Sequence, residues 1–302
     1  RPECLCNPHP GRGNARFRTF HGTDECLSVA AGHRDAVAPN GQTRIDHSGN
    51  ARVPVQSRPG VLGEPPEPAV ALESCACQEI PAEGRGFDSI WCGDSILARP
   101  RLEALSTLAA IAGRTKRVKL GTAVFLPALR NPVVLANEVA NLDIVSQGRV
   151  IFGVGIATKT QTVEKEFDAC GVSFRYRVSI FEECVTIMRK LWTESEVNFQ
   201  GRHFQLNEVS LGLKPVQQGG VPIWMAASAE KPQRRMLKMG DGWFPNATSP
   251  KAYTEGWQQI EELAKDSGGK SGQLHKALYT TVNINENKNQ ADKEMREFIE
   301  GY

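Results

Sequence analysis

Two sets of residues that could take part in chemistry follow apolar runs of this chain. Asp94 and Ser95 come directly after the apolar run 87–92, and a carboxyl group can donate or accept protons. Ala227 and Ser228 end another apolar run just before a helical pattern, where backbone N–H groups could hold a phosphate. Asp94 also has a structural interpretation, because it could simply cap the loop that follows it. Catalytic and structural roles therefore both stay open for this residue.

The elements that must position these residues begin at about residue 81. From there, short apolar runs alternate with amphipathic segments, which is typical of βα units around a parallel sheet. We expect strands at 87–92, 118–126, 149–156, 222–227, 242–245 and 278–284, and a hairpin within 197–213. We expect helices at 100–112, 132–145, 177–192, 231–239, 252–265 and 290–299. A closed barrel of this type needs eight strands. The expected fold is therefore α/β, a (β/α)8 TIM barrel that is incomplete, with its first and eighth strands not identifiable.

Residues 1–80 differ in composition from the rest of the chain. They are rich in Arg, Pro, Gly and His, they hold no sustained apolar period, and lysine is absent until Lys116. A disordered extension would explain this composition, and so would translation of a sequence never selected as this reading frame. We favour the second explanation. The expected organisation is a low-order or non-native extension over 1–80 and a barrel domain over 81–302 that is truncated at its C-terminal end.

Composition excludes several classes of function. The formal net charge is +2, and no basic stripe interleaved with aromatic residues points to nucleic acid. No apolar run is long enough to span a membrane, and the first residues lack the order of a signal peptide, so we expect a cytoplasmic protein. The two Cys-x-Cys pairs fit zinc spacing poorly, which predicts unpaired thiols and no metal.

Several motifs in a fixed order carry a family resemblance. They are GFDSIWCGD at 86–94, VKLGTAV at 118–124, RNPVVLA at 130–136, LDIVSQGR at 142–149, GVGI at 153–156, LW at 191–192, PIW at 222–224 and GDGW at 240–243. Together they resemble the luciferase-like monooxygenase family of flavin and deazaflavin enzymes. GVG alone would be a weak phosphate-loop signal, because the third glycine of a dinucleotide fingerprint is missing.

The resemblance also implies which residues form the site. It places Asp94 and Ser95, as catalytic residues, near the flavin ring, with Ser95 where many relatives carry histidine. The cofactor-binding residues that it implies are Ala123, Val124, Asn131, Gly155, Ile156, Ala157, Ala227 and Ser228. At Ala123 and Val124 relatives often have a backbone bulge behind the ring, and Ala157 stands where a glycine is common.

Structural interpretations compete with these roles. Ala123 and Val124 could be ordinary strand residues, and Asn131 could be an ordinary helix cap. Trp224 and Trp243 fit a core or barrel-lining role better than a substrate contact. The polar residues Asp143, Ser146 and Arg149 are interpreted as ties between a helix and a strand.

The resemblance implies redox chemistry on a small organic substrate. The expected activity is that of a monooxygenase using reduced flavin (FMN) and dioxygen. The alternatives are hydride transfer with the deazaflavin coenzyme F420, or a non-catalytic remnant. A homodimer is the expected assembly. Hydrolases rank last, because only His203 and His275 follow residue 80 and no Gly-x-Ser-x-Gly elbow occurs.

Overall fold

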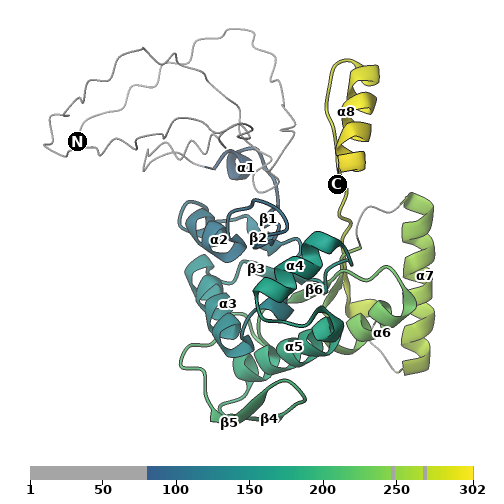
Figure 1. Cartoon of the computed structure of the whole chain (residues 1–302). Coiled ribbons are helices and arrows are strands. Elements are labelled where there is room, and N and C mark those ends of the chain that lie inside the picture. Colours follow the sequence, from purple (N-terminus) through teal and green to yellow (C-terminus); the bar gives the residue numbers. More distant parts are fainter. Residues whose placement is uncertain (1–79, 246–248, 268–270, 302) are drawn as a thin grey trace, which may run out of the picture. The chain divides into compact units, whose positions relative to one another are not determined.

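The main element of the structure, a computed structural model, is a six-stranded parallel sheet (Figure 1). The structure describes residues 80–245, 249–267 and 271–301. The strands follow the order β1-β2-β3-β6-β7-β8. Their bounds are β1 Ser89–Cys92, β2 Lys119–Thr122, β3 Val150–Val154, β6 Ile223–Met225, β7 Gly242–Trp243 and β8 His275–Lys276. The fold is thus α/β, with a curled parallel sheet that forms part of a barrel.

Helices alternate with these strands along the chain, and a small hairpin interrupts the alternation. The α-helices are α1 Pro81–Gly84, α2 Ala104–Ala112, α3 Pro132–Ser146, α4 Gln161–Ala169, α5 Arg177–Thr193, α6 Glu230–Met239, α7 Pro250–Ser267 and α8 Lys288–Gly301. Short 3-10 helices lie at Pro127–Leu129, Phe174–Tyr176 and Ser271–Gln273. The hairpin pairs β4 Val197–Gln200 with β5 Gln205–Val209 in antiparallel fashion. None of the helices in the described ranges is both long and apolar enough to cross a bilayer.

The two faces of the sheet carry different side chains because strand residues alternate in direction. One face contacts helices α2, α3 and α6, and its Leu120 and Phe152 lie in the hydrophobic core together with Ile187 of α5. The other face carries Trp91 of β1 and Trp224 of β6, whose ring centroids lie 5.5 Å apart. A Cβ atom on Gly121 would lie only 2.1 Å from the Trp91 ring, so glycine is required beside this indole.

Most of the predicted elements are confirmed, including the hairpin and five of the six strands. The helix expected from Pro100 begins instead at Ala104, because the Glu103 carboxylate caps it by accepting hydrogen bonds from the N–H groups of Leu105 and Ser106. The strand expected at 118–126 ends at Thr122.

The strand predicted at 278–284 is wrong. Pairing with β7 occurs earlier, at His275–Lys276, and Val282 and Ile284 are largely exposed. Within 278–284 the pairing is limited to a bridge at Tyr279, whose N–H donates to the Pro245 carbonyl at 3.0 Å. Helix α4 was not predicted, because its apolar side is narrow within a mainly polar segment. The expected extension over 1–80 lies almost entirely outside the described residues, so the domain boundary stays a prediction.

Replacing Gly153 tests the close approach of β2 and β3. A Cβ atom on Gly153 would lie 1.9 Å from the Thr122 carbonyl oxygen, a backbone atom that cannot turn away. We expect Gly153→Ala to lower the free energy of unfolding by about 3 kcal/mol, measured by urea titration. Gly212→Ala is the control, since a Cβ atom there meets nothing within 4 Å. Equal stability of the two variants would contradict the register of β2 and β3.

Candidate functional site

The carboxyl ends of four neighbouring strands form one edge of the sheet. Hydrogen bonds continue beyond the strands themselves: Ala123 N–H donates to the Cys92 carbonyl at 2.8 Å, and Ala226 N–H to the Val154 carbonyl at 3.2 Å. The residues after β1, β2, β3 and β6 therefore follow one another along this edge. All ten candidate residues from the sequence lie in these connecting segments, and nine of them directly follow the strand ends. Barrel enzymes build their sites at such an edge.

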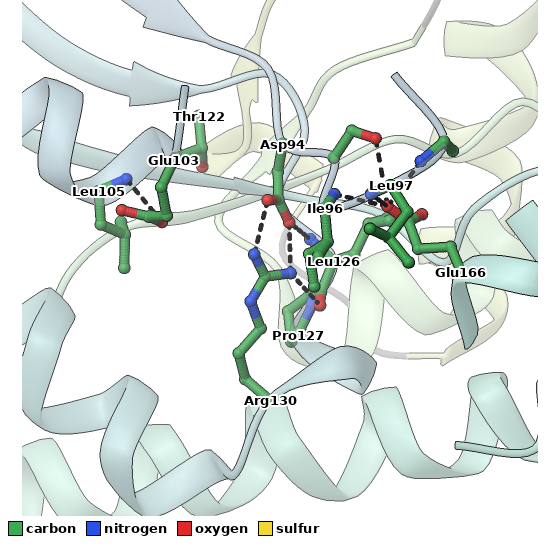
Figure 2. Close-up of polar contacts among 12 residues, drawn as sticks. Asp94, Ile96, Leu97, Glu103, Leu105, Thr122, Leu126, Pro127, Arg130 and Glu166 are labelled. Carbon is green, nitrogen blue, oxygen red and sulfur yellow. Dashed lines mark hydrogen bonds and ion pairs between the residues drawn. The ribbon is translucent and has the colours of Figure 1, made fainter. Parts of the chain in front are cut away.

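Asp94, directly after β1, forms a buried ion pair with Arg130 (Figure 2). The two guanidinium nitrogens of Arg130 donate to the two carboxylate oxygens at 2.7 Å each, and the N–H of Leu126 donates to Oδ2 at 3.0 Å. The Asp94 side chain is 1% exposed and that of Arg130 is 18% exposed. The guanidinium also lies 4.3 Å from the centre of the Phe125 ring. The pair fastens the β1 loop to the segment that leads into α3.

Burial governs the proton affinity of Asp94. Desolvation raises the pKa of this carboxyl above its ordinary value, and the opposing effect of the Arg130 charge is smaller. Both carboxylate oxygens already accept hydrogen bonds from Arg130. In this geometry the carboxylate anchors the loop, and its catalytic role stays a prediction.

Ser95 belongs to a second polar cluster, which is centred on Glu166 of α4 (Figure 2). Ser95 Oγ donates to Glu166 Oε1 at 3.2 Å and accepts a hydrogen bond from Arg99 N–H at 2.8 Å. The same oxygen of Glu166 accepts the N–H groups of Ile96, Leu97 and Ala98 at 2.5, 2.8 and 3.2 Å. Glu166 is only 1% exposed. A buried carboxylate thus holds the loop after β1 against the helix after β3.

The predicted pair Ala123 and Val124 directly follows β2, and both residues are half-buried. The peptide bond between them is cis. Asn131, farther along this connection, caps α3: its Oδ1 accepts the N–H groups of Val133 at 2.9 Å and Val134 at 3.3 Å. The structural interpretation of Asn131 is therefore confirmed, while its contact with a cofactor stays a prediction.

The end of β3 approaches the end of β2 closely. Gly155 is buried, and a Cβ atom there would lie 2.6 Å from Val124 Cγ2. Ile156 and Ala157 follow, both half-buried, and Ala157 has a φ of 62°. This left-handed conformation favours glycine. It explains in physical terms why a glycine would suit the position of Ala157.

The end of β6 leads directly into helix α6. Ala227 is buried and its carbonyl accepts the indole N–H of Trp243 at 2.7 Å, whereas Ser228 is exposed. Helix α6 has no side-chain cap at its N-terminus, although α2, α3 and α4 each have one. The first N–H groups of α6 are therefore not satisfied by a capping side chain.

Aromatic rings line the sheet face that carries Trp91 and Trp224. Phe244, just after β7, lies 4.9 Å from Trp91 and 6.2 Å from Trp224, measured between ring centroids. The indole Nε1 of Trp224 is buried and has no hydrogen-bond partner within the described part of the chain. Trp243 is 2% exposed, which confirms its predicted core role.

The polar ties predicted from sequence are confirmed at the opposite end of the sheet. Arg149 donates to the carbonyl groups of Ala112, Thr115 and Val118. Asp143 is fully buried and accepts hydrogen bonds from Val216 and Gln217. These groups join helices to strands away from the candidate site.

Sequence reasoning missed Arg130 and Glu166. Arg130 lies within a quoted motif, but nothing local shows that its partner is 36 residues earlier. The signal for Glu166 is a charged residue beside Phe167 on the inward side of an amphipathic segment, and it becomes visible only once α4 is recognised.

Comparison with known proteins identifies the family in which these motifs occur. The sequence profile of the luciferase-like monooxygenase family matches residues 78–302. An F420-dependent glucose-6-phosphate dehydrogenase from Kineococcus radiotolerans is 31% identical over 225 residues, covering 70% of this chain and 64% of that protein. A 5,10-methylenetetrahydromethanopterin reductase from Methanolobus tindarius is 30% identical over 203 residues, covering 67% of this chain and 59% of that protein. The chain therefore spans less than two thirds of the length of these relatives.

Solved structures share the fold. An F420-dependent secondary alcohol dehydrogenase in complex with an F420–acetone adduct superposes with a TM-score of 0.63 and 26% identity, covering 71% of this chain and 66% of that one. The monooxygenase RslO1 from Streptomyces bottropensis gives a TM-score of 0.62 at 23% identity, covering 73% of this chain and 71% of that one. The second likeness supports the fold alone.

The ion pair can be tested by removing each partner. We expect Asp94→Ala and Arg130→Ala each to lower the free energy of unfolding by about 3 kcal/mol, because each leaves an uncompensated charge in a largely buried place. The double variant should lose less than the sum of the two, as measured by urea titration. Lys251→Ala, which removes an exposed partner of Glu255, is the control and should change stability by less than about 0.5 kcal/mol. Additive losses would show that Asp94 and Arg130 do not interact.

Proposed function

The chain belongs to the luciferase-like monooxygenase family, and from this premise we propose that it is an oxidoreductase that uses the deazaflavin coenzyme F420. The reaction is hydride transfer between the cofactor and a small organic substrate. The observation that carries this proposal is the sequence likeness to F420-dependent enzymes, together with a strand edge whose residues fit the cofactor.

Two features of the edge suit a flat, anionic cofactor. Two residues that follow the strand ends, Ala123 and Ala157, have small side chains, as the neighbours of a planar ring should. The uncapped N-terminus of α6 offers N–H groups to a phosphate, although Glu230 of its first turn is acidic and pairs with Arg234 at 2.8 Å.

The chain's own residues supply position more than proton transfer. When bound, the deazaflavin supplies the carbon atom that accepts or donates the hydride. Asp94 and Arg130 fix the start of the β1 loop, and Val124 and Ile156 present apolar surface that excludes water. Ser95 stands where an imidazole would act as acid or base, and its hydroxyl is engaged by Glu166 and Arg99. A serine hydroxyl at this position is therefore a weaker acid or base than a histidine imidazole would be.

A second candidate is oxygenation of a small organic substrate with reduced FMN and dioxygen. It is favoured by the family's monooxygenase description. With either cofactor, we propose that the six strands are part of an eight-stranded (β/α)8 barrel, the architecture that places such an edge at one mouth. Assembly as a homodimer is proposed on the same resemblance.

Cofactor titration distinguishes the two candidates. We expect coenzyme F420 to bind saturably in the micromolar range and at least tenfold more tightly than reduced FMN, read by fluorescence. At a free F420 concentration of a hundred times the dissociation constant, the cofactor should stabilise the fold by about 2.7 kcal/mol and raise the melting temperature. Preferred binding of reduced FMN would replace the first candidate with the second. Binding of neither would overturn the proposed function and favour a remnant without catalysis.

A matched pair of variants locates the binding site. Ser228→Trp places a bulky ring at the exposed end of β6 and should weaken F420 binding at least tenfold. Ser195→Trp makes the same change at an exposed serine between α5 and β4, and should leave binding unchanged. Equal binding by both variants would place the cofactor elsewhere.

A further inference from the structure

Residues 95–98 form a segment whose backbone is fixed by a single buried group. The N–H groups of Ile96, Leu97 and Ala98 all donate to Oε1 of Glu166. Hydrogen bonds to a charged acceptor are stronger than those between neutral groups. This segment, called here the 95–98 lip, is therefore held by Glu166, to which the Ser95 hydroxyl also donates.

The strand order places the lip over the end of β2. The lip follows β1, whereas Glu166 belongs to α4, which follows β3. Because β2 lies between β1 and β3 in the sheet, a contact between these two connections passes across the carboxyl end of β2. Ala123 and Val124 are the residues at that end. The lip thus borders the place where the resemblance puts the cofactor ring.

The side chains of the lip determine which kind of ligand is favoured beside it. Ile96 is 44% exposed and Leu97 is 60% exposed, although both are large and apolar. Their N–H groups donate to the buried carboxylate of Glu166, and Figure 2 shows both residues beside it. Ordered apolar side chains beside a site favour ligands that bury apolar surface against them.

We propose that Glu166 is a positioning residue and that Ile96 and Leu97 determine specificity, selecting a substrate with a neutral, apolar portion. The proposal rests on the proposed function, because it assumes that this edge is the binding site. The carboxylate holds the lip in one conformation, and the apolar pair packs against the substrate. A substrate that is anionic throughout gains nothing from these contacts.

Hydrogen exchange tests the positioning role without cofactor or substrate. In the full chain, the amides of residues 96–98 should exchange slowly, and Glu166→Ala should speed them at least tenfold. Glu166→Gln keeps an acceptor oxygen but removes the charge, so it should speed the same amides by a smaller factor, which makes it the variant that still reports if Glu166→Ala does not fold. Unprotected amides in the wild type, or unchanged exchange in a folded Glu166→Ala variant, would overturn the positioning role.

Ligand-observed NMR tests the specificity role in the F420-loaded chain. Cyclohexanol is the neutral apolar probe and glucose 6-phosphate is the anionic probe. In the chain saturated with F420, we expect cyclohexanol to bind more tightly than glucose 6-phosphate, and Leu97→Ser to weaken the binding of cyclohexanol about tenfold. Leu213→Ser removes a similarly exposed leucine outside the strand edge and should have no effect.

The outcomes separate this inference from the proposed function. If F420 binds but Leu97→Ser leaves cyclohexanol binding unchanged, or if glucose 6-phosphate binds more tightly, the specificity role is wrong and the proposed function stands. If F420 does not bind, the proposed function fails, and hydrogen exchange still decides whether Glu166 fixes the lip.

Discussion

The parallel register of β1, β2, β3 and β6 is the constraint on which the candidate site depends. Because all of these strands run in one direction, their carboxyl ends meet at one edge, and residues up to 134 positions apart in the sequence border it, from Asp94 to Ser228. The close contacts of Gly121 with Trp91 and of Gly153 with Thr122 allow the strands to approach without side chains between them. The loops can then be placed accurately, since each starts from a fixed strand end.

Two buried carboxylates fix the position of the loop after β1 at this edge. Asp94 pairs with Arg130 and so joins the β1 loop to the start of α3. Glu166 binds the next residues of the same loop from the other side of β2. Such buried charges are stable only with full sets of partners. The cost of desolvating them indicates that they determine the position of the loop more than they add to overall stability.

The sequence predicts the strands and helices well where apolar periodicity is strong, as in β3 and α5. It fails where tertiary contacts decide the structure. Glu103 caps α2 and delays its start, and the apolar alternation at 278–284 forms no strand because pairing with β7 occurs at His275. The family motifs identify the candidate edge. The partners Arg130 and Glu166 could not be found, because hydrogen bonds across 36 and 71 residues leave no local pattern.

The most direct test of the account is a crystal structure of the chain with coenzyme F420 bound. The account predicts that the deazaflavin ring lies against Val124, between residues 95–98 and Ala157, with its phosphate near the N-terminus of α6. A ring bound anywhere else, such as the depression between α5 and α6 that includes Arg189 and Lys238, would contradict the assignment of this edge as the redox site.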